Sequence, residues 1–362
     1  MKKIVTVLGA RPQFIKASVV SNAITQSNFL TEKVIHTGQH FDANMSDVFF
    51  HELGMAKPAY QLEIHGGTHG AMTGRMLSEI ERVLLDEKPD AVLVYGDTNS
   101  TLAGALAAVK LHIPVAHVEA GLRSFNMLMP EEINRILTDR ISSWLFAPTT
   151  VAAQHLMTEG IGSEKIHLVG DVMYDVALYH GARVSAEAGI LKQLNLKPGS
   201  YVLATVHRAE NTDNLERLTA IVDALVAIAE SIRVVWPLHP RTRAVLLQTG
   251  RLERLSGKVT LIEPVGYLDM VQLEKYTALI ATDSGGVQKE AFFYGVPCVT
   301  LRDETEWVEL VESGWNRLAP PVDAQSLVRL IKAALGSRGE PVAPYGTGSA
   351  AQAIVDKLSE LS

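Results

Sequence analysis

Short apolar runs, rich in β-branched residues, alternate with longer helix-like segments along almost the whole chain. This alternation favours parallel sheets that are covered by helices on both faces. One series of candidate strands covers residues 4–8, 33–36, 91–95, 115–118 and 145–147, and a second covers residues 201–205, 233–237, 259–262, 279–281 and 299–301. Helix-like segments include residues 14–25, 70–85, 100–111, 215–228 and 270–276. The pattern predicts an α/β protein with two facing Rossmann-like domains, and a ligand site in the cleft between them at the carboxyl ends of the strands.

The length of 362 residues agrees with two domains. A helical, linker-like stretch at residues 181–199 separates the two series of strands. We expect an N-terminal Rossmann-like domain over residues 1–170 and a C-terminal Rossmann-like domain over residues 171–345. A short helix within residues 346–362 is expected to pack back on the N-terminal domain.

Charge and composition exclude several classes of protein. The net charge of −7 and the pI near 6.0 argue against a nucleic-acid partner, because nucleic-acid binders normally carry a basic surface. No stretch approaches the roughly 20 apolar residues of a membrane helix, so no membrane partner is expected. Cys298 is the single cysteine, which excludes an intrachain disulfide and indicates a small core residue. These features favour the cytoplasm.

Carboxylates follow the strands of the N-terminal half. Asp97 follows residues 91–95, Glu119 follows residues 115–118, and Glu131 opens a helix. Capping can explain an aspartate at a helix start, and acidic residues are common in first helical turns. A glutamate directly after an apolar strand is poorly explained by either. We interpret these residues as candidates for acid/base chemistry.

Two cations, Arg11 and Lys16, follow the first strand in the segment Gly9-Ala-Arg-Pro-Gln-Phe-Ile-Lys16. This segment is not GxGxxG, so the usual NAD fingerprint is absent. No redox cofactor and no metal are expected.

The C-terminal half carries cations and a glycine turn. His207 and His239 follow successive strands, each near an arginine, and Arg302 follows the last strand. The turn Ser284-Gly285-Gly286 would let a phosphate approach the backbone N–H groups at a helix N-terminus. Glu290, one helical turn later, could accept hydrogen bonds from the vicinal hydroxyls of a ribose. Carboxylates in one half and a phosphate turn in the other suit a diphosphate leaving group combined with proton transfer on a sugar.

These motifs resemble, over nearly the full length, those of the non-hydrolysing UDP-N-acetylglucosamine 2-epimerases. The resemblance implies a fold like that of the B-type glycosyltransferases. It also implies anti-elimination of UDP to a glycal, followed by re-addition with the C2 proton returned to the other face. The matching pieces are Gly9-Ala-Arg-Pro12 with Lys16, Gly96-Asp97-Thr98, His117-Val-Glu-Ala-Gly-Leu-Arg123, Pro130-Glu-Glu132 with Asn134-Arg135, His207-Arg208 with Glu210-Asn211, Asp283-Ser-Gly-Gly-Val-Gln288 with Glu290, and Leu301-Arg-Asp303.

The resemblance further implies the roles of residues and a homodimer. The expected catalytic residues are Asp97, Glu119, Glu131 and His207, with His207 also at the UDP. The residues expected to bind substrate or UDP are Arg11, Lys16, Arg135, His239, Ser284, Gly285, Gly286, Glu290 and Arg302.

Two departures from the usual family pattern indicate a branch. The first segment has Gln13 and Phe14 where common members have Glu-Ala, and the last has Trp307-Val308 where they have Arg-Pro. Both changes look more like the branch that acts on UDP-2,3-diacetamido-2,3-dideoxyglucuronate, a precursor of lipopolysaccharide O-antigen sugars. The segment at residues 37–43 also differs from the family's usual Gln-His-Arg stretch, which is tied to allosteric activation by substrate in some relatives.

Three other functions fit parts of the pattern. A UDP-sugar-dependent glycosyltransferase of the same fold would share the UDP site but would need an acceptor groove, often with a basic membrane-facing helix, and no such stretch is present. A hydrolysing epimerase would release the free sugar. A UDP-sugar sensor would not need the acid/base carboxylates.

Overall fold

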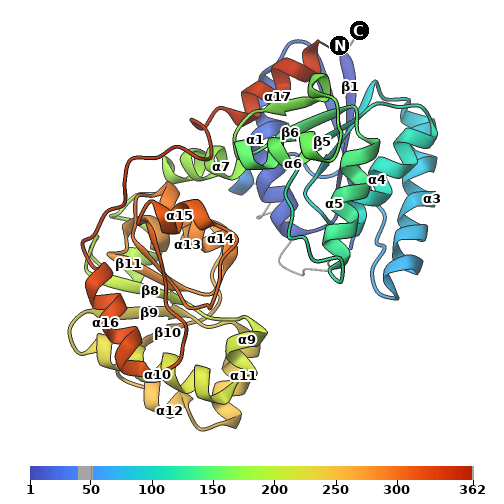
Figure 1. The fold of residues 1–362 in the computed structure, drawn as a ribbon. Helices are drawn as coiled ribbons and strands as arrows, with labels where there is room; N and C mark the ends of the chain where they lie inside the picture. The colour runs from blue at the N-terminus through green and yellow to red at the C-terminus, as the bar shows by residue number, and fades with distance from the viewer. Residues whose placement is uncertain (40–49, 51, 361–362) are drawn as a thin grey trace. The chain divides into compact units, whose positions relative to one another are not determined.

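The computed structural model describes residues 1–39, 50 and 52–360 (Figure 1). The chain divides into two compact units, Met1–Val176 with Ala343–Ser362 and Ala177–Val342. The helix α7 (Val172–Gly181) crosses from the first unit into the second.

The first unit contains a seven-stranded sheet in the order β3-β2-β1-β4-β5-β6-β7, with every neighbouring pair parallel. Its strands are β1 (Lys2–Leu8), β2 (Leu30–His36), β3 (Tyr60–Gln61), β4 (Ala91–Tyr95), β5 (Val115–Val118), β6 (Trp144–Ala147) and β7 (Ile166–Leu168). Its helices are α1 (Arg11–Gln26), α3 (His69–Glu87), α4 (Asn99–Lys110), α5 (Pro130–Ile141), α6 (Thr150–Thr158), the short 3-10 helix η1 (Ser163–Lys165) and the C-terminal α17 (Ala350–Ser359).

The second unit contains a six-stranded parallel sheet in the order β10-β9-β8-β11-β12-β13. Its strands are β8 (Tyr201–Thr205), β9 (Arg233–Pro237), β10 (Thr260–Ile262), β11 (Leu279–Thr282), β12 (Cys298–Thr300) and β13 (Asn316–Leu318). Its helices are α8 (Gly189–Gln193), α9 (Ala209–Thr212), α10 (Leu215–Ala229), α11 (Pro240–Gln248), α12 (Leu252–Leu255), α13 (Tyr267–Tyr276), α14 (Gly285–Phe293), α15 (Val308–Glu312) and α16 (Ala324–Ala334).

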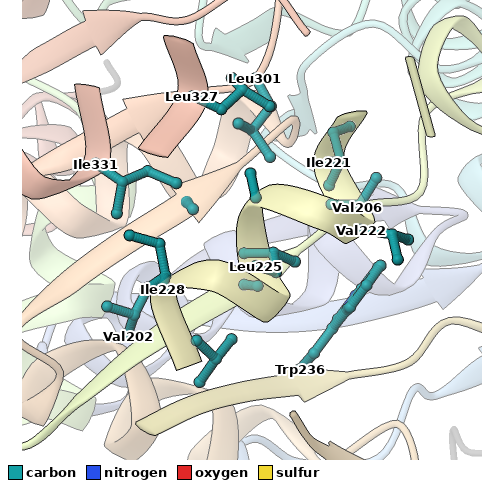
Figure 2. Packing of buried hydrophobic residues seen from close by; sticks show 14 of the residues in the cluster. Val202, Val206, Ile221, Val222, Leu225, Ile228, Trp236, Leu301, Leu327 and Ile331 are labelled. Carbon is teal, nitrogen blue, oxygen red and sulfur yellow. The ribbon is translucent and has the colours of Figure 1, made fainter. Parts of the chain in front are cut away.

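The central strands of the second sheet, β8 and β11, are almost entirely apolar and fully buried. In β8, Val202 lies in the cluster that packs under α10 and α16, whereas Leu203 points to the opposite cluster under α13 and α14. This alternation is the two-residue period of a strand. Figure 2 shows part of the first cluster, with Leu225 and Ile228 of α10 in the same core as Val202 of β8 and Trp236 of β9.

The predicted fold class is confirmed, since both units are parallel sheets with helices. Every predicted strand is present, with ends that differ by at most three residues. The sequence interpretation did not include β3, β7 and β13, which are two or three residues long and lie at the edges of their sheets.

The C-terminal helix α17 packs against α1 within the first unit (Figure 1). Its N-terminus is fixed by Asp175 of α7, which accepts hydrogen bonds from the backbone N–H groups of Ala350 at 3.1 Å and Ala351 at 2.9 Å. A carboxylate at this position satisfies free N–H groups of the first turn and interacts favourably with the helix dipole. Residues 361–362, the end of the segment expected to contain this helix, lie outside the described residues.

Among the described residues no helix is long and apolar enough to cross a membrane. The same part of the chain holds no group of three or more His, Cys, Asp or Glu side chains that could bind a metal ion. Cys298 is buried in β12, and burial raises the pKa of its thiol to about 12. The cysteine is therefore a core residue.

Candidate active site

Each sheet has one position where the strand order reverses, between β1 and β4 in the first unit and between β8 and β11 in the second. Ligands of open parallel sheets bind outside the carboxyl ends of the strands at such positions. The segments that leave these four strands begin with Gly9, Gly96, Val206 and Asp283. Arg11, Asp97, His207 and Ser284 lie in or just after these segments, whereas Glu119, His239 and Arg302 follow the neighbouring strands β5, β9 and β12.

Close packing makes Gly9 necessary at the first of these positions. A Cβ atom on Gly9 would lie 1.9 Å from Ser100 Oγ, so any side chain would clash. The backbone N–H groups of Gly9 and Ala10 donate to Gln13 Oε1 at 2.8 and 3.1 Å, and Gln13 Nε2 donates to the carbonyl oxygen of Tyr95 at 2.7 Å. The neutral amide thus joins the end of β1 to the end of β4 with both of its polar atoms.

Lys16 of α1 and Glu119, which directly follows β5, form an ion pair beyond the carboxyl ends of the strands of the first sheet. Lys16 Nζ lies 2.7 Å from Glu119 Oε2 and 2.9 Å from Oε1. Burial lowers the pKa of Lys16, but the attraction of Glu119 outweighs it and leaves the pKa above the ordinary value. Glu119 is only 6% exposed, and its φ of 68° is one that side-chain-bearing residues rarely adopt. Strain of this kind concentrates at functional sites.

Asp97 follows β4 and is bound by Arg135, whose Nη2 lies 2.5 Å from Asp97 Oδ2. Arg135 Nη1 also donates to Glu132 Oε2 at 2.7 Å, so one guanidinium joins two carboxylates. Glu132 is buried and accepts the backbone N–H groups of Ser124 and Phe125 as well. Burial raises the pKa of Glu132, but these N–H groups and Arg135 outweigh it and hold the pKa below its usual range. Glu132 is therefore a structural anion that orients Arg135.

Glu131 lies in the first turn of α5 and is half-buried. Within the described residues, its carboxylate has neither a hydrogen bond nor an ion pair. It is therefore more open to a substrate than Glu132, which follows it in the sequence.

In the second unit, Asp283 organises the segment after β8. Its buried carboxylate accepts the backbone N–H groups of His207 at 3.1 Å and Arg208 at 3.0 Å, and Nδ2 of Asn211 at 3.1 Å. His207 Nδ1 lies 3.3 Å from Asp283 Oδ1. Burial lowers the pKa of His207 and the negative charge of Asp283 offsets only part of this effect, so the pKa lies below the ordinary value.

The predicted glycine turn forms the N-terminus of α14. Ser284 caps the helix with its side chain, and Gly285 and Gly286 are its first two residues. A Cβ atom on Gly285 would lie 2.2 Å from Glu306 Oε1, whereas one on Gly286 would make only an ordinary contact, 3.9 Å from Ser284 Oγ. Glu306 is bound in turn by Arg302 Nη1 at 2.7 Å. The open N–H groups of this turn suit a phosphate.

Glu290 lies one turn further along α14 and is half-buried. Burial raises its pKa to about 7. Glu274 of α13 interacts electrostatically with Glu290. It is buried, and neither of its carboxylate oxygens has a hydrogen-bond partner. Burial raises the pKa of Glu274 well above the ordinary value. Burial therefore favours the neutral form of Glu274.

The predicted residues His239 and Arg11 each lie at the start of a helix. His239 is exposed and caps α11, since its Nδ1 accepts the backbone N–H of Arg241 at 3.2 Å, and its ring lies 5.9 Å from that of His207. Arg11 is the first residue of α1. The structure thus brings together Asp97 with Arg135, Lys16 with Glu119, His207 with His239, and Gly285 with Arg302 through Glu306.

The sequence predicted Lys16 and Arg135 as site residues but assigned no role to Asp283, Glu132, Asp139 or Glu306, which hold other residues of these groups. Asp283 directly follows β11, so its position at a strand end could have indicated it. Glu132, Arg135 and Asp139 are spaced three and four residues apart on one face of α5, a helical spacing that could have indicated a shared buried surface. Glu306 offered no comparable signal.

A family model described as UDP-N-acetylglucosamine 2-epimerase matches residues 22–359. A Pseudomonas aeruginosa protein named UDP-2,3-diacetamido-2,3-dideoxy-D-glucuronate 2-epimerase is 57% identical over 366 residues, covering 99% of this chain and 100% of that protein. The chain belongs to the UDP-N-acetylglucosamine 2-epimerase family.

Structures of two UDP-N-acetylglucosamine 2-epimerases agree with this assignment. The Methanocaldococcus jannaschii enzyme in complex with UDP-GlcNAc and UDP is 46% identical with a TM-score of 0.84, over 99% of each chain. The Neisseria meningitidis enzyme bound to UDP-GlcNAc is 33% identical with a TM-score of 0.83, over 98% of this chain and 99% of that one. Membership in the family confirms the resemblance that the motifs predicted and the predicted enzyme class, an isomerase.

Proposed function

We propose that this chain inverts carbon 2 of UDP-2,3-diacetamido-2,3-dideoxyglucuronate, with UDP-N-acetylglucosamine as the second candidate substrate. The observation that carries the proposal is the 57% identity to a protein named for the first reaction, compared with 46% to a UDP-N-acetylglucosamine 2-epimerase. Gln13 and Trp307 support the same branch, because both depart from the common family pattern.

The proposed reaction needs no change of oxidation state. A base removes the C2 proton, the C2–H electrons form the C1–C2 double bond, and the C1–O bond breaks so that UDP leaves with its electron pair. Re-addition of UDP and return of a proton to the opposite face of C2 give the epimer. Loss of UDP makes the otherwise unreactive C2–H acidic, so groups that stabilise the diphosphate also promote the carbon chemistry.

Proton transfer is assigned to the carboxylates of the first unit, Asp97, Glu119 and Glu131. Asp97 and Glu119 support this role because each is paired with one cation, Arg135 or Lys16, in a partly buried setting. The paired cation fixes the position of the carboxylate, and proton transfer requires a group held in a fixed position.

The UDP is assigned to the second unit. The N-terminus of α14, with Ser284, Gly285 and Gly286, would hold the diphosphate, with positive charge from Arg302 and with His207 nearby. Glu290 would accept the ribose hydroxyls. Arg11 and His239 are proposed as further ligands, and His207 as a catalytic group at the leaving oxygen.

We also propose a cytoplasmic homodimer that serves the synthesis of O-antigen sugars. An exposed apolar surface on the first unit supports the dimer, since large exposed apolar surfaces usually mark interaction sites. This surface, the α5 patch, consists of Phe125, Met127, Leu128, Met129, Ile133 and Leu137.

The substrate is tested by offering each UDP-sugar separately and measuring kcat/KM for its conversion to the manno epimer. A kcat/KM at least about tenfold higher for the diacetamidoglucuronate, or about 1.4 kcal/mol of transition-state discrimination, is expected. A preference for UDP-N-acetylglucosamine would overturn the choice of branch.

A further inference from the structure

His117 is bound through both nitrogens of its ring. It lies in β5 and is completely buried, with Nδ1 2.7 Å from Asp139 Oδ1 and Nε2 2.7 Å from the carbonyl oxygen of Gly96. The carbonyl oxygen can only accept a hydrogen bond, so Nε2 carries a hydrogen.

The surroundings of Asp139 show that Nδ1 carries a hydrogen too. The second oxygen of Asp139 lies 2.8 Å from Arg123 Nη1 and accepts the backbone N–H of Gly121 at 3.1 Å. A carboxylate that faces a guanidinium and a backbone N–H is favoured in its ionised form. The ionised form can only accept, so His117 donates from both ring nitrogens as an imidazolium.

These bonds join the two turns that carry Asp97 and Glu119. Gly96, whose carbonyl oxygen binds His117, directly precedes Asp97, and Gly121, whose N–H binds Asp139, follows Glu119 by two residues. Both turns have unusual backbone angles, with φ of 62° at Gly96, 68° at Glu119 and 81° at Gly121. A Cβ atom on Gly96 would lie 3.3 Å from Glu119 Oε2, so the turns are also close together.

We propose that His117 is a positioning residue that, as a buried imidazolium paired with Asp139, fixes the turn at residues 96–97 relative to the turn at residues 119–121. The inference rests on the proposed function, because its consequence is the placement of two carboxylates about one reacting carbon. A displacement of about 1 Å in such a group can lower the rate about a hundredfold. His117 itself touches neither the substrate nor the reacting atoms.

Two substitutions of His117 each retain one of the two hydrogen bonds of the ring and remove the other. The side-chain amide of His117→Asn places a donor near the position of Nδ1 and retains the bond to Asp139. His117→Gln places a donor near the position of Nε2 and retains the bond to Gly96. Each variant should lower kcat about 10- to 100-fold while KM and the affinity for UDP stay within about twofold, because the carboxylates move and the UDP turn does not.

The matched control is His167→Asn, which changes a histidine of the edge strand β7 in the same sheet and should leave kcat unchanged. Wild-type turnover in both His117 variants, with UDP binding intact, would overturn the proposal. A fall in kcat that merely follows the fraction of folded protein at the assay temperature would also overturn it, since the role would then be structural.

A measurement on the unaltered protein avoids the risk of misfolding. Long-range ¹⁵N–¹H correlation of histidine-labelled protein should show His117 with both ring nitrogens protonated at neutral pH. A neutral ring with one protonated nitrogen would contradict the proposal. This readout needs no substrate, so it remains decisive if the wild-type protein fails to epimerise either UDP-sugar, an outcome that would instead refute the proposed function.

Discussion

At the residue scale, the two carboxylates that follow β4 and β5 are each held by one cation. Arg135 lies 2.5 Å from Asp97, and Lys16 lies 2.7 Å from Glu119. Lys16 comes from α1 and Arg135 from α5, so helices far apart in the sequence supply the charges. The pairing fixes the orientation of the carboxylates before a substrate binds.

Loss of the carboxylate at Asp97 or at Glu131 should strongly lower kcat without weakening UDP binding. Asp97→Asn and Glu131→Gln keep the size of the side chain but lose its basicity, so kcat should fall roughly 10²- to 10⁴-fold. Calorimetric titration with UDP should give a Kd close to that of the wild type. The exposed Asp86→Asn serves as a control, and full turnover in a carboxylate variant would remove that residue from the mechanism.

Nucleoside binding should depend on the ionisation of Glu290. Burial raises its pKa to about 7, and the ionised carboxylate is the stronger acceptor for ribose hydroxyls. Affinity for uridine, which lacks a titrating phosphate, should therefore rise several-fold between about pH 6 and pH 8. Glu290→Gln should bind weakly and without this pH dependence. An identical pH profile in both proteins would show that another group is responsible.

At the element scale, α5 illustrates how one helix face can organise a site. Glu132, Arg135 and Asp139 point to the segments that follow β4 and β5, and each binds a turn or a carboxylate there. In the second unit, Asp283 has the same role from the end of β11. Such buried charges need partners because an unpaired buried charge is costly.

Glu274 of α13 is a buried acid without hydrogen-bond partners, and it should reduce stability at high pH. Its folded-state pKa is raised by burial, so the folded protein holds a proton that the unfolded chain releases above the ordinary pKa of 4.5. The contribution of Glu274 to the free energy of unfolding is complete below the ordinary pKa of 4.5. This contribution is lost as the pH rises through the folded-state pKa.

Glu274→Gln should remove the loss of stability at high pH, because glutamine does not ionise. The variant should raise Tm relative to the wild type more at about pH 8 than at about pH 5, as measured by differential scanning calorimetry. Glu253→Gln, on the exposed surface of α12, is the control and should show no such trend. An equal effect of Glu274→Gln at both pH values would contradict a raised pKa for Glu274.

The sequence predicted the central strands because each contains a short apolar run, and these runs are buried in the structure. It did not predict β13, whose residues Asn316, Arg317 and Leu318 form an edge strand without such a run. Residues at strand ends, such as Asp97 and Ser284, could be predicted because parallel strands bring their carboxyl ends to one edge. The pairing of Arg135 with Asp97 could not be predicted, since the two residues are 38 positions apart and their contact depends on how α5 packs.

At the scale of the whole molecule, each unit carries one part of the proposed chemistry. The carboxylates belong to Met1–Val176 and the phosphate turn to Ala177–Val342. The first unit also carries the α5 patch, in which Leu128 is 93% exposed. Exposed apolar area of this kind stabilises an assembly when a second copy covers it.

A charge in the α5 patch should prevent dimer formation. Leu137→Asp places a carboxylate on its helical part, and light scattering should then give the mass of a monomer where the wild type gives that of a dimer. Leu247→Asp, on the exposed side of α11 in the second unit, is the matched control and should remain dimeric. A dimeric Leu137→Asp protein would place the interface elsewhere, and a monomeric wild type would refute the homodimer.

The most direct test of the central claim is hydrogen exchange at carbon 2. The wild-type protein is incubated in D₂O with UDP-2,3-diacetamido-2,3-dideoxyglucuronate and, separately, with UDP-N-acetylglucosamine, and the C1 and C2 protons are followed by NMR. Elimination and re-addition of UDP predict deuterium at C2 together with a manno-configured UDP-sugar from at least one substrate. Retention of the C2 hydrogen in both would contradict the proposed epimerisation.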